Sequence, residues 1–302
     1  MLHSRMLRYL DEVARCGSIR QAAERLNVAS SAINRQILAL EAELGTPIFH
    51  RLPRRLRLTA TGEVVISHVR ETLKEHRRVQ SRIHDLKGLS VGEVTLATMN
   101  GLAGGFLPRI AAEFGQRHPR AQISIRSLFV DEIIHAVVSG EADLGLGYNL
   151  PADPRLRLVE AFDTRLGAVV APGHPLALRS PVRLSECAAY PIILSDASMT
   201  IHQLMIAAFA RSDLLIEPTF RSNSLEFMKK LAGSEKGVTF LSDVDVAEEQ
   251  HTGSLVYLPI QDRHVSKQPL CLVHRAKRTL DTTASLFLEE IRDALRELVH
   301  KA

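Results

Sequence analysis

The sequence predicts a multidomain protein: a small all-α unit with a short β-ribbon, then one long helix, then a larger two-lobed α/β domain. Three observations predict this order. Apolar residues recur at helical spacing through the first sixty residues, a narrow apolar stripe continues over residues 61–87, and short strands alternate with helices from residue 94 onward. With 302 residues, of which 45% are hydrophobic, the chain is long enough for two or three separate cores.

Composition excludes several classes of protein. No apolar run approaches the ~18 residues of a membrane span, and charged side chains interrupt the N-terminus, so we expect neither a membrane segment nor a signal peptide. The three cysteines, Cys16, Cys187 and Cys271, are far apart and odd in number. They predict buried free thiols in a cytoplasmic protein rather than a disulfide framework or a metal site.

Basic charge is concentrated toward the N-terminus. Residues 1–90 hold 16 Lys and Arg against 9 Asp and Glu, whereas the remaining residues hold 22 basic and 25 acidic side chains. Binding to nucleic-acid phosphates requires such an excess, although a modest excess is also common on an ordinary solvated surface.

The first forty-five residues predict three helices. Residues 2–15 form an amphipathic helix, Ser18 caps a second short helix, and a third helix runs from Ser30 or Ser31 to Leu44. Two short helices, a tight turn and a longer third helix are the parts of a helix-turn-helix.

The third helix begins with polar side chains that are long enough to reach base edges in a DNA major groove. After it, alternating leucine and arginine predict a two-stranded ribbon with a basic tip, a wing whose arginines touch phosphates or enter a minor groove. A helical bundle with a charged face is the alternative. The expected DNA-binding residues of this winged helix-turn-helix are Ser30, Ser31, Asn34, Arg35, Gln36, Arg51, Arg54 and Arg55.

The N-terminal segment contains a characteristic set of residues: Gly17-Ser18, Ala22-Ala23-Glu24-Arg25-Leu26, Val28, Ala32-Ile33, Arg35-Gln36-Ile37, Leu40-Glu41, Leu44-Gly45, Phe49, Arg51, Arg54 and Leu58-Thr59-Ala60-Thr61-Gly62. In these residues it resembles the LysR-type transcriptional regulators. At Ala29 it departs from a serine that often caps the recognition helix in that family, so we expect Ser30 or Ser31 to provide the cap.

A linker helix is expected over residues 61–88, after a DNA-binding domain of residues 1–60. Its apolar stripe steps by three or four residues from Ile66 to Leu86, which is closer to a coiled-coil seam than to a globular core face. Such a helix needs a partner. The resemblance implies the same helix of a second chain, packed antiparallel, in a homotetramer built as a dimer of dimers; docking on the chain's own C-terminal domain is the alternative.

Residues 91–302 predict α/β layers with largely parallel strands, because strands and helices alternate there. The pattern resembles the two-lobed effector domain of LysR-type regulators and, more distantly, periplasmic solute-binding proteins. The resemblance implies lobe I over about 91–164 and 267–302, and lobe II over about 165–266. Strands are expected over 94–97, 123–128, 142–147, 166–170, 191–194, 217–221, 237–241 and 270–273, and helices over 105–117, 132–139, 200–212, 225–232 and 282–299.

Ligands of open α/β sheets bind beyond the carboxyl ends of strands, often at helix N-termini. Three loops meet this condition, and their hydroxyl and amide groups suit a small anion such as a carboxylate; plain helix capping is the alternative for each residue. The loops supply Thr98, Met99, Asn100, Ser195, Met199, Thr200, Ser222 and Asn223, and the resemblance adds Ser127, Phe129 and Gly147.

No catalytic motif is present: there is no Gly-x-Ser-x-Gly, no phosphate-binding glycine loop, no His-Glu-x-x-His and no paired cysteine ligands. We therefore expect no enzyme and no cofactor, and a structural role for His174 in its Gly–Pro turn. A solute-binding protein and a non-specific architectural DNA protein are the rivals; the basic N-terminal unit argues against the first and the ligand-type domain against the second. The resemblance implies a sequence-specific transcriptional regulator controlled by a small effector, with double-stranded DNA, further copies of itself and RNA polymerase as partners.

Overall fold

The computed structural model describes residues 5–52, 55–86, 92–234, 237–265, 267–277 and 279–301. Among these residues, no helix combines the length and the apolar character needed to cross a membrane. The N-terminal part, which we call the head, contains α1 (Arg5–Cys16), α2 (Ile19–Leu26), α3 (Ser30–Leu44), β1 (Phe49–Leu52) and β2 (Arg55–Leu58).

The three predicted helices and the ribbon of the head are confirmed. Ser18 caps α2 by accepting a hydrogen bond from the backbone N–H of Gln21 (3.4 Å). The expected cap of α3 is wrong, because Ser30 is already the first helical residue and Ala29, which lacks a side-chain acceptor, precedes it. The carbonyl oxygen of Ala29 instead accepts from the N–H groups of Ala32 (3.0 Å) and Ile33 (3.4 Å).

A tight joint connects the ribbon to α4 (Ala60–Leu86). The hydroxyl of Thr59 donates to the carbonyl oxygen of Pro47 (2.7 Å) and accepts from the N–H of Gly62 (2.9 Å). A Cβ atom on Gly62 would lie 2.1 Å from the carbonyl oxygen of Ile48, so only glycine fits. The direction in which α4 leaves the ribbon is therefore fixed by backbone contact.

The sequence predicted one continuous apolar seam along α4 that packs against a partner helix. In the structure, this stripe is not continuous. Ile66 and Val69 are buried in the core of the head, where they pack with α1 residues such as Leu10 and Val13. Val79, farther along the helix, is 39% exposed. The stripe is therefore divided between its first turns, which complete the head, and Val79, which is exposed.

The C-terminal domain is built on one mixed nine-stranded sheet with the order β4-β3-β5-β11-β6-β9-β7-β8, and β10 also pairs with β6. The strands are β3 (Glu93–Thr98), β4 (Gln122–Ser127), β5 (Leu144–Tyr148), β6 (Leu156–Val170), β7 (Ile192–Ser195), β8 (Phe220–Ser222), β9 (Val238–Ser242), β10 (Val256–Pro259) and β11 (Lys267–Arg275).

The prediction of largely parallel strands holds only toward the two ends of the sheet. There β3 is parallel to β4 and β5, and β7 is parallel to β8 and β9. In the middle, β6 and β11 are antiparallel, because the chain leaves the first half of the sheet along β6 and returns along β11. The two ends form lobe I (around β3, β4 and β5) and lobe II (around β7, β8 and β9), and β6 pairs with strands of both.

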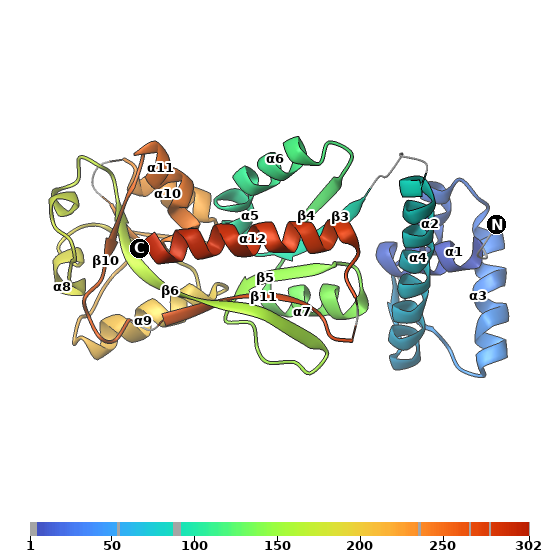
Figure 1. Ribbon diagram of the computed structural model, residues 1–302. Helices are drawn as coiled ribbons and strands as arrows, with labels where there is room; N and C mark the ends of the chain where they lie inside the picture. The colour runs from blue at the N-terminus through green and yellow to red at the C-terminus, as the bar shows by residue number, and fades with distance from the viewer. Residues whose placement is uncertain are drawn as a thin grey trace.

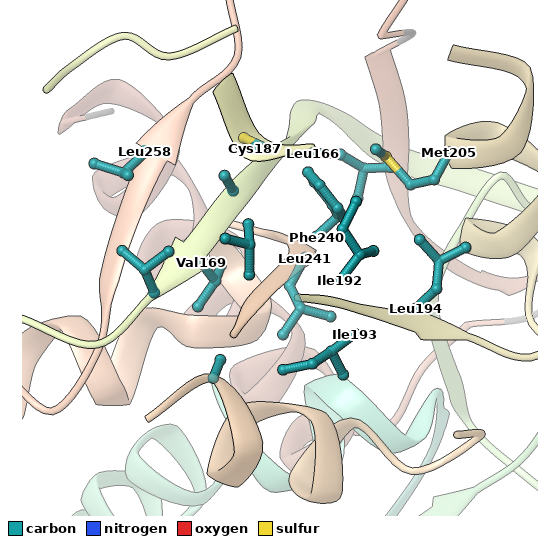
Figure 2. Packing of buried hydrophobic residues seen from close by; sticks show 14 of the residues in the cluster. Leu166, Val169, Cys187, Ile192, Ile193, Leu194, Met205, Phe240, Leu241 and Leu258 are labelled. Atoms are coloured by element: carbon teal, nitrogen blue, oxygen red, sulfur yellow. The ribbon is translucent and has the colours of Figure 1, made fainter. Parts of the chain in front are cut away.

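Each lobe has its own hydrophobic core and its own helices. In lobe I, Phe114 and Phe287 meet edge to face with ring centroids 5.0 Å apart. In lobe II, Leu166, Ile193 and Phe240 belong to a separate cluster (Figure 2). Lobe I carries α5 (Asn100–Gly104), α6 (Leu107–Arg117), α7 (Val130–Ser139) and α12 (Thr282–Lys301); lobe II carries η1 (Pro175–Leu178), α8 (Leu184–Cys187), α9 (Thr200–Arg211), α10 (Leu225–Ala232), η2 (Val244–Val246) and α11 (Ala247–Thr252).

Figure 1 shows the head and α4 at one end of the molecule, lobe II at the other end, and lobe I between them. The helix expected over 105–117 corresponds to α6, which begins at Leu107, and a separate short helix that was not expected, α5, precedes it, with Gly105 at the break between the two. A Cβ atom at Gly105 would lie 2.8 Å from the carbonyl oxygen of Asp245, so this break lets the two backbones approach closely.

Candidate nucleic-acid interface and ligand cleft

The N-terminal half of α3 presents polar side chains to solvent. Ser30, Ser31 and Arg35 are exposed, while Ile33 and Ile37 on the opposite side of the helix are fully buried in the core of the head. This division leaves the polar face free to enter a groove of DNA without disturbing the packing that holds the helix.

The first strand of the ribbon brings a basic side chain to this face. The guanidinium of Arg51 lies 3.4 Å from the side-chain oxygen of Asn34 and 3.9 Å from a carboxylate oxygen of Glu41. The other carboxylate oxygen of Glu41 accepts from the N–H groups of Ile48 (2.8 Å) and Phe49 (3.2 Å). Glu41 therefore fixes the start of β1 and holds Arg51 beside α3; the predicted DNA-binding set omitted it, although it belongs to the sequence pattern.

The remaining predicted DNA-binding residues differ in their surroundings. Arg55 is exposed on β2, and Arg54 lies outside the described residues. Gln36 is half buried, and its side-chain oxygen has no hydrogen-bond partner in the described part of the chain. Arg57, which the predicted set also omitted, is exposed and lies opposite His50 in the ribbon.

In lobe I, four predicted ligand residues lie at or just after the ends of the adjacent strands β3 and β4. Asn100 and Ser127 are exposed, and their side-chain oxygens are 3.5 Å apart. Thr98 is fully buried at the end of β3, and within the described part of the chain its hydroxyl has no hydrogen-bond partner. The sulfur atom of Met99, the next residue, accepts a hydrogen bond from the backbone N–H of Tyr148 (3.3 Å).

Phe129 and Gly147 are arranged differently from these four. Phe129, the residue before α7, has a side chain that is 63% exposed. Gly147 is buried, and a Cβ atom there would point at Leu150 (3.0 Å) and Ile133 (3.4 Å), so the position faces α7. Only the backbone of Gly147 can therefore serve a ligand.

The lobe II residues of the predicted set lie around the ends of β7 and β8. Ser195 and Ser222 are paired in register, and Ser195 accepts a hydrogen bond on its carbonyl oxygen from Nδ1 of His202 (2.6 Å). Met199 precedes α9 and is partly buried against the lobe II core, whereas Thr200 is exposed at the first position of that helix. His202, which the sequence did not single out, helps to position the Ser195 backbone.

The capping alternative holds for the third loop. The hydroxyl of Ser222 accepts from the N–H of Ser224 (3.0 Å), and the hydroxyl of Ser224 accepts from the N–H of Phe227 (3.3 Å). Asn223 between them is exposed. Of this loop, only Asn223 keeps its side chain available to a ligand.

The two lobes are joined beside these loops by a buried cluster that the sequence did not predict. The hydroxyl of Tyr148 lies 2.6 Å from the hydroxyl of Ser242, which donates to a carboxylate oxygen of Asp245 (3.1 Å). Burial raises the pKa of Asp245 to about 6 and the pKa of Tyr148 well above its ordinary value.

His174 and two of the three cysteines are buried within the described part of the chain. His174 is buried and accepts the N–H of Leu176 on Nδ1 (3.1 Å), which confirms its structural role. No group of three or more His, Cys, Asp and Glu that could hold a metal occurs among the described residues. Cys187 and Cys271 are buried free thiols as expected, whereas Cys16 is only partly buried because it lies at the exposed end of α1.

Comparison with known proteins covers nearly the whole chain. The model of the bacterial regulatory helix-turn-helix protein, lysR family, matches residues 4–63, and that of the LysR substrate binding domain matches residues 87–296. A RuBisCO operon transcriptional regulator of Allochromatium vinosum is 26% identical over 285 residues, which cover 94% of each chain. The regulator CysB of Burkholderia cenocepacia is 28% identical over 238 residues, covering 78% of this chain and 76% of the relative.

Solved structures share the fold. A full-length OxyR variant of Pseudomonas aeruginosa superimposes with a TM-score of 0.71 at 18% identity, covering 97% of this chain and 95% of that one. Full-length CbnR in complex with its target DNA superimposes with a TM-score of 0.61 at 22% identity, covering 96% of this chain and 99% of that one.

Proposed function

The chain belongs to the LysR family of DNA-binding transcriptional regulators, and from this premise we propose how its parts act. Residues 1–60 are the DNA-binding domain, residues 61–88 are the linker and dimerisation helix, and residues 91–302 bind the effector. Within the last unit, lobe I takes residues 91–164 and 267–302, and lobe II takes residues 165–266.

The exposed polar face of α3 is the observation that carries the DNA-binding proposal. With Ile33 and Ile37 holding the helix from behind, Arg35 is free to reach base edges in the major groove. The guanidinium of Arg51, held beside Asn34, contacts the sugar–phosphate chain that flanks the groove. The remaining contacts come from Ser30, Ser31, Gln36, Arg54 and Arg55.

We propose that the effector is a small anion bound between the lobes. The buried hydroxyl of Thr98, which has no partner among the described residues, and the exposed side chains of Asn100 and Ser127 offer donors from lobe I. Thr200, at the first turn of the twelve-residue helix α9, offers a positive helix end from lobe II. The further ligand contacts are Met99, Phe129, Gly147, Ser195, Met199, Ser222 and Asn223.

Oligomerisation follows from the part of α4 that the head leaves open. Two chains pair along the later turns of this helix, where Val79 is exposed, and two such dimers form a tetramer with several heads on one DNA. Effector binding changes the spacing of the bound half-sites and thereby the recruitment of RNA polymerase.

Two variants test the DNA-binding face. The binding of each to duplexes selected from random DNA by the unmodified protein is measured by fluorescence anisotropy at several salt concentrations. Arg35→Ala is expected to lower specific affinity by about 1–3 kcal/mol and to relax base preference, because it removes a base contact. Arg54→Ala is expected to weaken all duplexes evenly and to reduce the salt slope by about one, because it removes a phosphate contact.

The matched control is Arg109→Ala, an exposed arginine of α6 in lobe I that should leave DNA binding unchanged. The assignment fails when both head variants bind like the unmodified protein.

A second experiment tests the cleft with a library of small carboxylates and thermal unfolding of the whole chain. A carboxylate present at about 100 times its Kd stabilises the folded state by about 2.7 kcal/mol. Thr98→Val and Ser127→Ala should each reduce this stabilisation, because each removes a hydroxyl proposed to donate to the ligand while leaving the side-chain volume nearly unchanged. Retention of the full shift in both variants would place the ligand elsewhere.

A further inference from the structure

A buried arginine joins three parts of the chain that are far apart in sequence. Arg70 of α4 is 5% exposed, and its Nε donates to a carboxylate oxygen of Asp11 in α1 (2.8 Å). Its Nη1 lies 2.6 Å from a carboxylate oxygen of Glu141, in the turn between α7 and β5 of lobe I. One guanidinium therefore bridges the head and the effector-binding domain.

Both carboxylates are held on rigid supports. Asp11 also pairs with Arg15 one helical turn away (3.1 Å). Glu141 follows Gly140, which ends α7 with a positive φ of 79°, and the next two N–H groups are bonded to the carbonyl oxygens of Ala136 (2.9 Å) and Thr95 (2.8 Å). The turn that carries Glu141 is thus fixed to β3 and α7, so a change in the position of lobe I moves Glu141 with it.

The charge of Glu141 is balanced from both sides. Its second oxygen accepts from Nη1 of Arg126 on β4 (2.8 Å). Burial would raise the pKa of Glu141, but this hydrogen bond and the charge of Arg70 hold the pKa below its ordinary value. The carboxylate therefore stays ionised at neutral pH and remains available to the buried guanidinium.

The geometry requires arginine. The two carboxylates approach different nitrogen atoms of a planar fork, and the single ammonium of a lysine cannot reproduce both directions. A guanidinium that is 5% exposed also needs carboxylate partners, since an unpaired buried charge is costly. Asp11 belongs to the head and stays with Arg70, so the contact that depends on the relative position of head and lobe I is the one with Glu141.

We propose that Arg70 is a positioning residue that locks the head onto lobe I through Asp11 and Glu141, and so sets the spacing of the DNA half-sites. This inference rests on the proposed DNA-binding face. Arg70 does not belong to that face: it fixes the position of the head and does not determine which base sequence the head binds.

The chain itself provides a matched control at the same junction. Arg275 of β11 also reaches α4, but with longer contacts, at 3.3 Å from the hydroxyl of Ser67 and 3.7 Å from a carboxylate oxygen of Glu71. Its side chain is 24% exposed, so water can replace these contacts. Arg275→Met therefore removes a cation at the junction without removing the buried bridge.

The head-to-lobe distance is measured by double electron–electron resonance. Spin labels are attached at Arg20→Cys in the head and Arg109→Cys in lobe I, with Cys16→Ser to prevent labelling there, and labelled chains are diluted with unlabelled ones. The intact protein should give one narrow distance distribution. Arg70→Met and Glu141→Gln should broaden or shift it, and Arg275→Met should leave it unchanged.

DNA binding separates positioning from folding. Glu141→Gln leaves the Arg70–Asp11 pair between α4 and the head intact, so its affinity for a duplex with a single half-site should stay within about twofold, whereas its preference among spacings of paired half-sites should change by about tenfold. Loss of single half-site binding in Arg35→Ala tests the DNA-binding face separately. The proposal is overturned by an intact protein whose distribution is already broad, by unchanged distributions in Glu141→Gln, or by equal effects of Arg275→Met.

Discussion

The head meets lobe I through charges, whereas lobe I meets lobe II through buried hydrogen bonds and direct backbone approach. At the first junction, one guanidinium lies within 2.8 Å of two carboxylates. At the second, Tyr148 and Ser242 are 2.6 Å apart, and Gly101 leaves room for only a hydrogen atom against Asp245. The two junctions therefore differ in what their separation exposes: at the first, ions that water can hydrate once they are apart, and at the second, apolar and unpaired polar groups together.

Relative motion of the lobes is therefore expected to pivot about the contact around Asp245 rather than to open there. Val244 belongs to the lobe I core, while Val246 belongs to the lobe II core, so the short helix η2 is anchored in both. The head can leave lobe I without disturbing either core.

The largest expected effect is a dependence of the free energy of unfolding on pH that arises from Asp245 at the junction of the two lobes. Its pKa is about 6 in the folded protein against an ordinary value of 3.8, so between these values only the folded state holds the proton. Stability should fall as the pH rises through this window, by roughly 3 kcal/mol in total. Asp245→Asn should remove this slope and be the more stable protein at pH 7, as measured by urea unfolding at pH 4 to 7.

Asp153→Asn serves as the control for that series. The pKa of Asp153 is lowered to about 2 by hydrogen bonds from Arg155, so its contribution to stability is present above its ordinary pKa and disappears only as the pH falls toward 2. Its replacement should leave the slope between pH 4 and 6 unchanged. An unaltered slope in Asp245→Asn would show that Asp245 is solvated, and the second junction would then resemble the first.

A smaller effect is expected from adding one methyl group at the junction of the lobes. The Cβ atom of Gly101→Ala would lie 2.6 Å from a carboxylate oxygen of Asp245 and 2.7 Å from a methyl carbon of Leu225. Because all three residues are buried, overpacking should cost about 2 kcal/mol in urea unfolding. Gly104→Ala in the same helix is the matched control, since its nearest neighbour is 3.5 Å away; equal stability of the two variants would contradict the close packing.

The smallest effect is expected at an exposed contact of the ionic junction. Nε2 of His135 in α7 lies 3.5 Å from a carboxylate oxygen of Glu63 in α4, and both side chains are about half exposed. Glu63→Gln should change the free energy of unfolding by less than about 0.5 kcal/mol, because solvent screens such pairs. A loss of several kcal/mol at this site would mean that the whole junction acts cooperatively rather than through Arg70.

Local sequence patterns predicted the head well because its functional residues are contiguous. Ser18, the ribbon and the polar start of α3 lie within about forty residues, and each depends on spacing that a helix or strand imposes. Arg70 and Glu141 could not be paired in the same way, since 71 positions separate them and either side chain is ordinary on a solvated surface. The cluster of Tyr148, Ser242 and Asp245 was missed for the same reason.

Local sequence patterns also could not predict the strand directions in the middle of the sheet or the break between α5 and α6. Alternating strands and helices predict parallel neighbours, but nothing in the residues of β6 shows that it continues from one lobe into the other. The glycines at 104 and 105 are visible in the sequence, yet the role of Gly105 depends on Asp245, which approaches it from another part of the fold.

The joint at Gly62 has a mechanical consequence. Since a side chain cannot fit between this residue and the carbonyl group of Ile48, the ribbon and α4 turn together as one lever. The 27 residues of α4 give that lever a length of about 40 Å at about 1.5 Å per residue. A rotation of roughly 5° at one end then displaces the other by about 3.5 Å, close to the axial rise of a single DNA base pair.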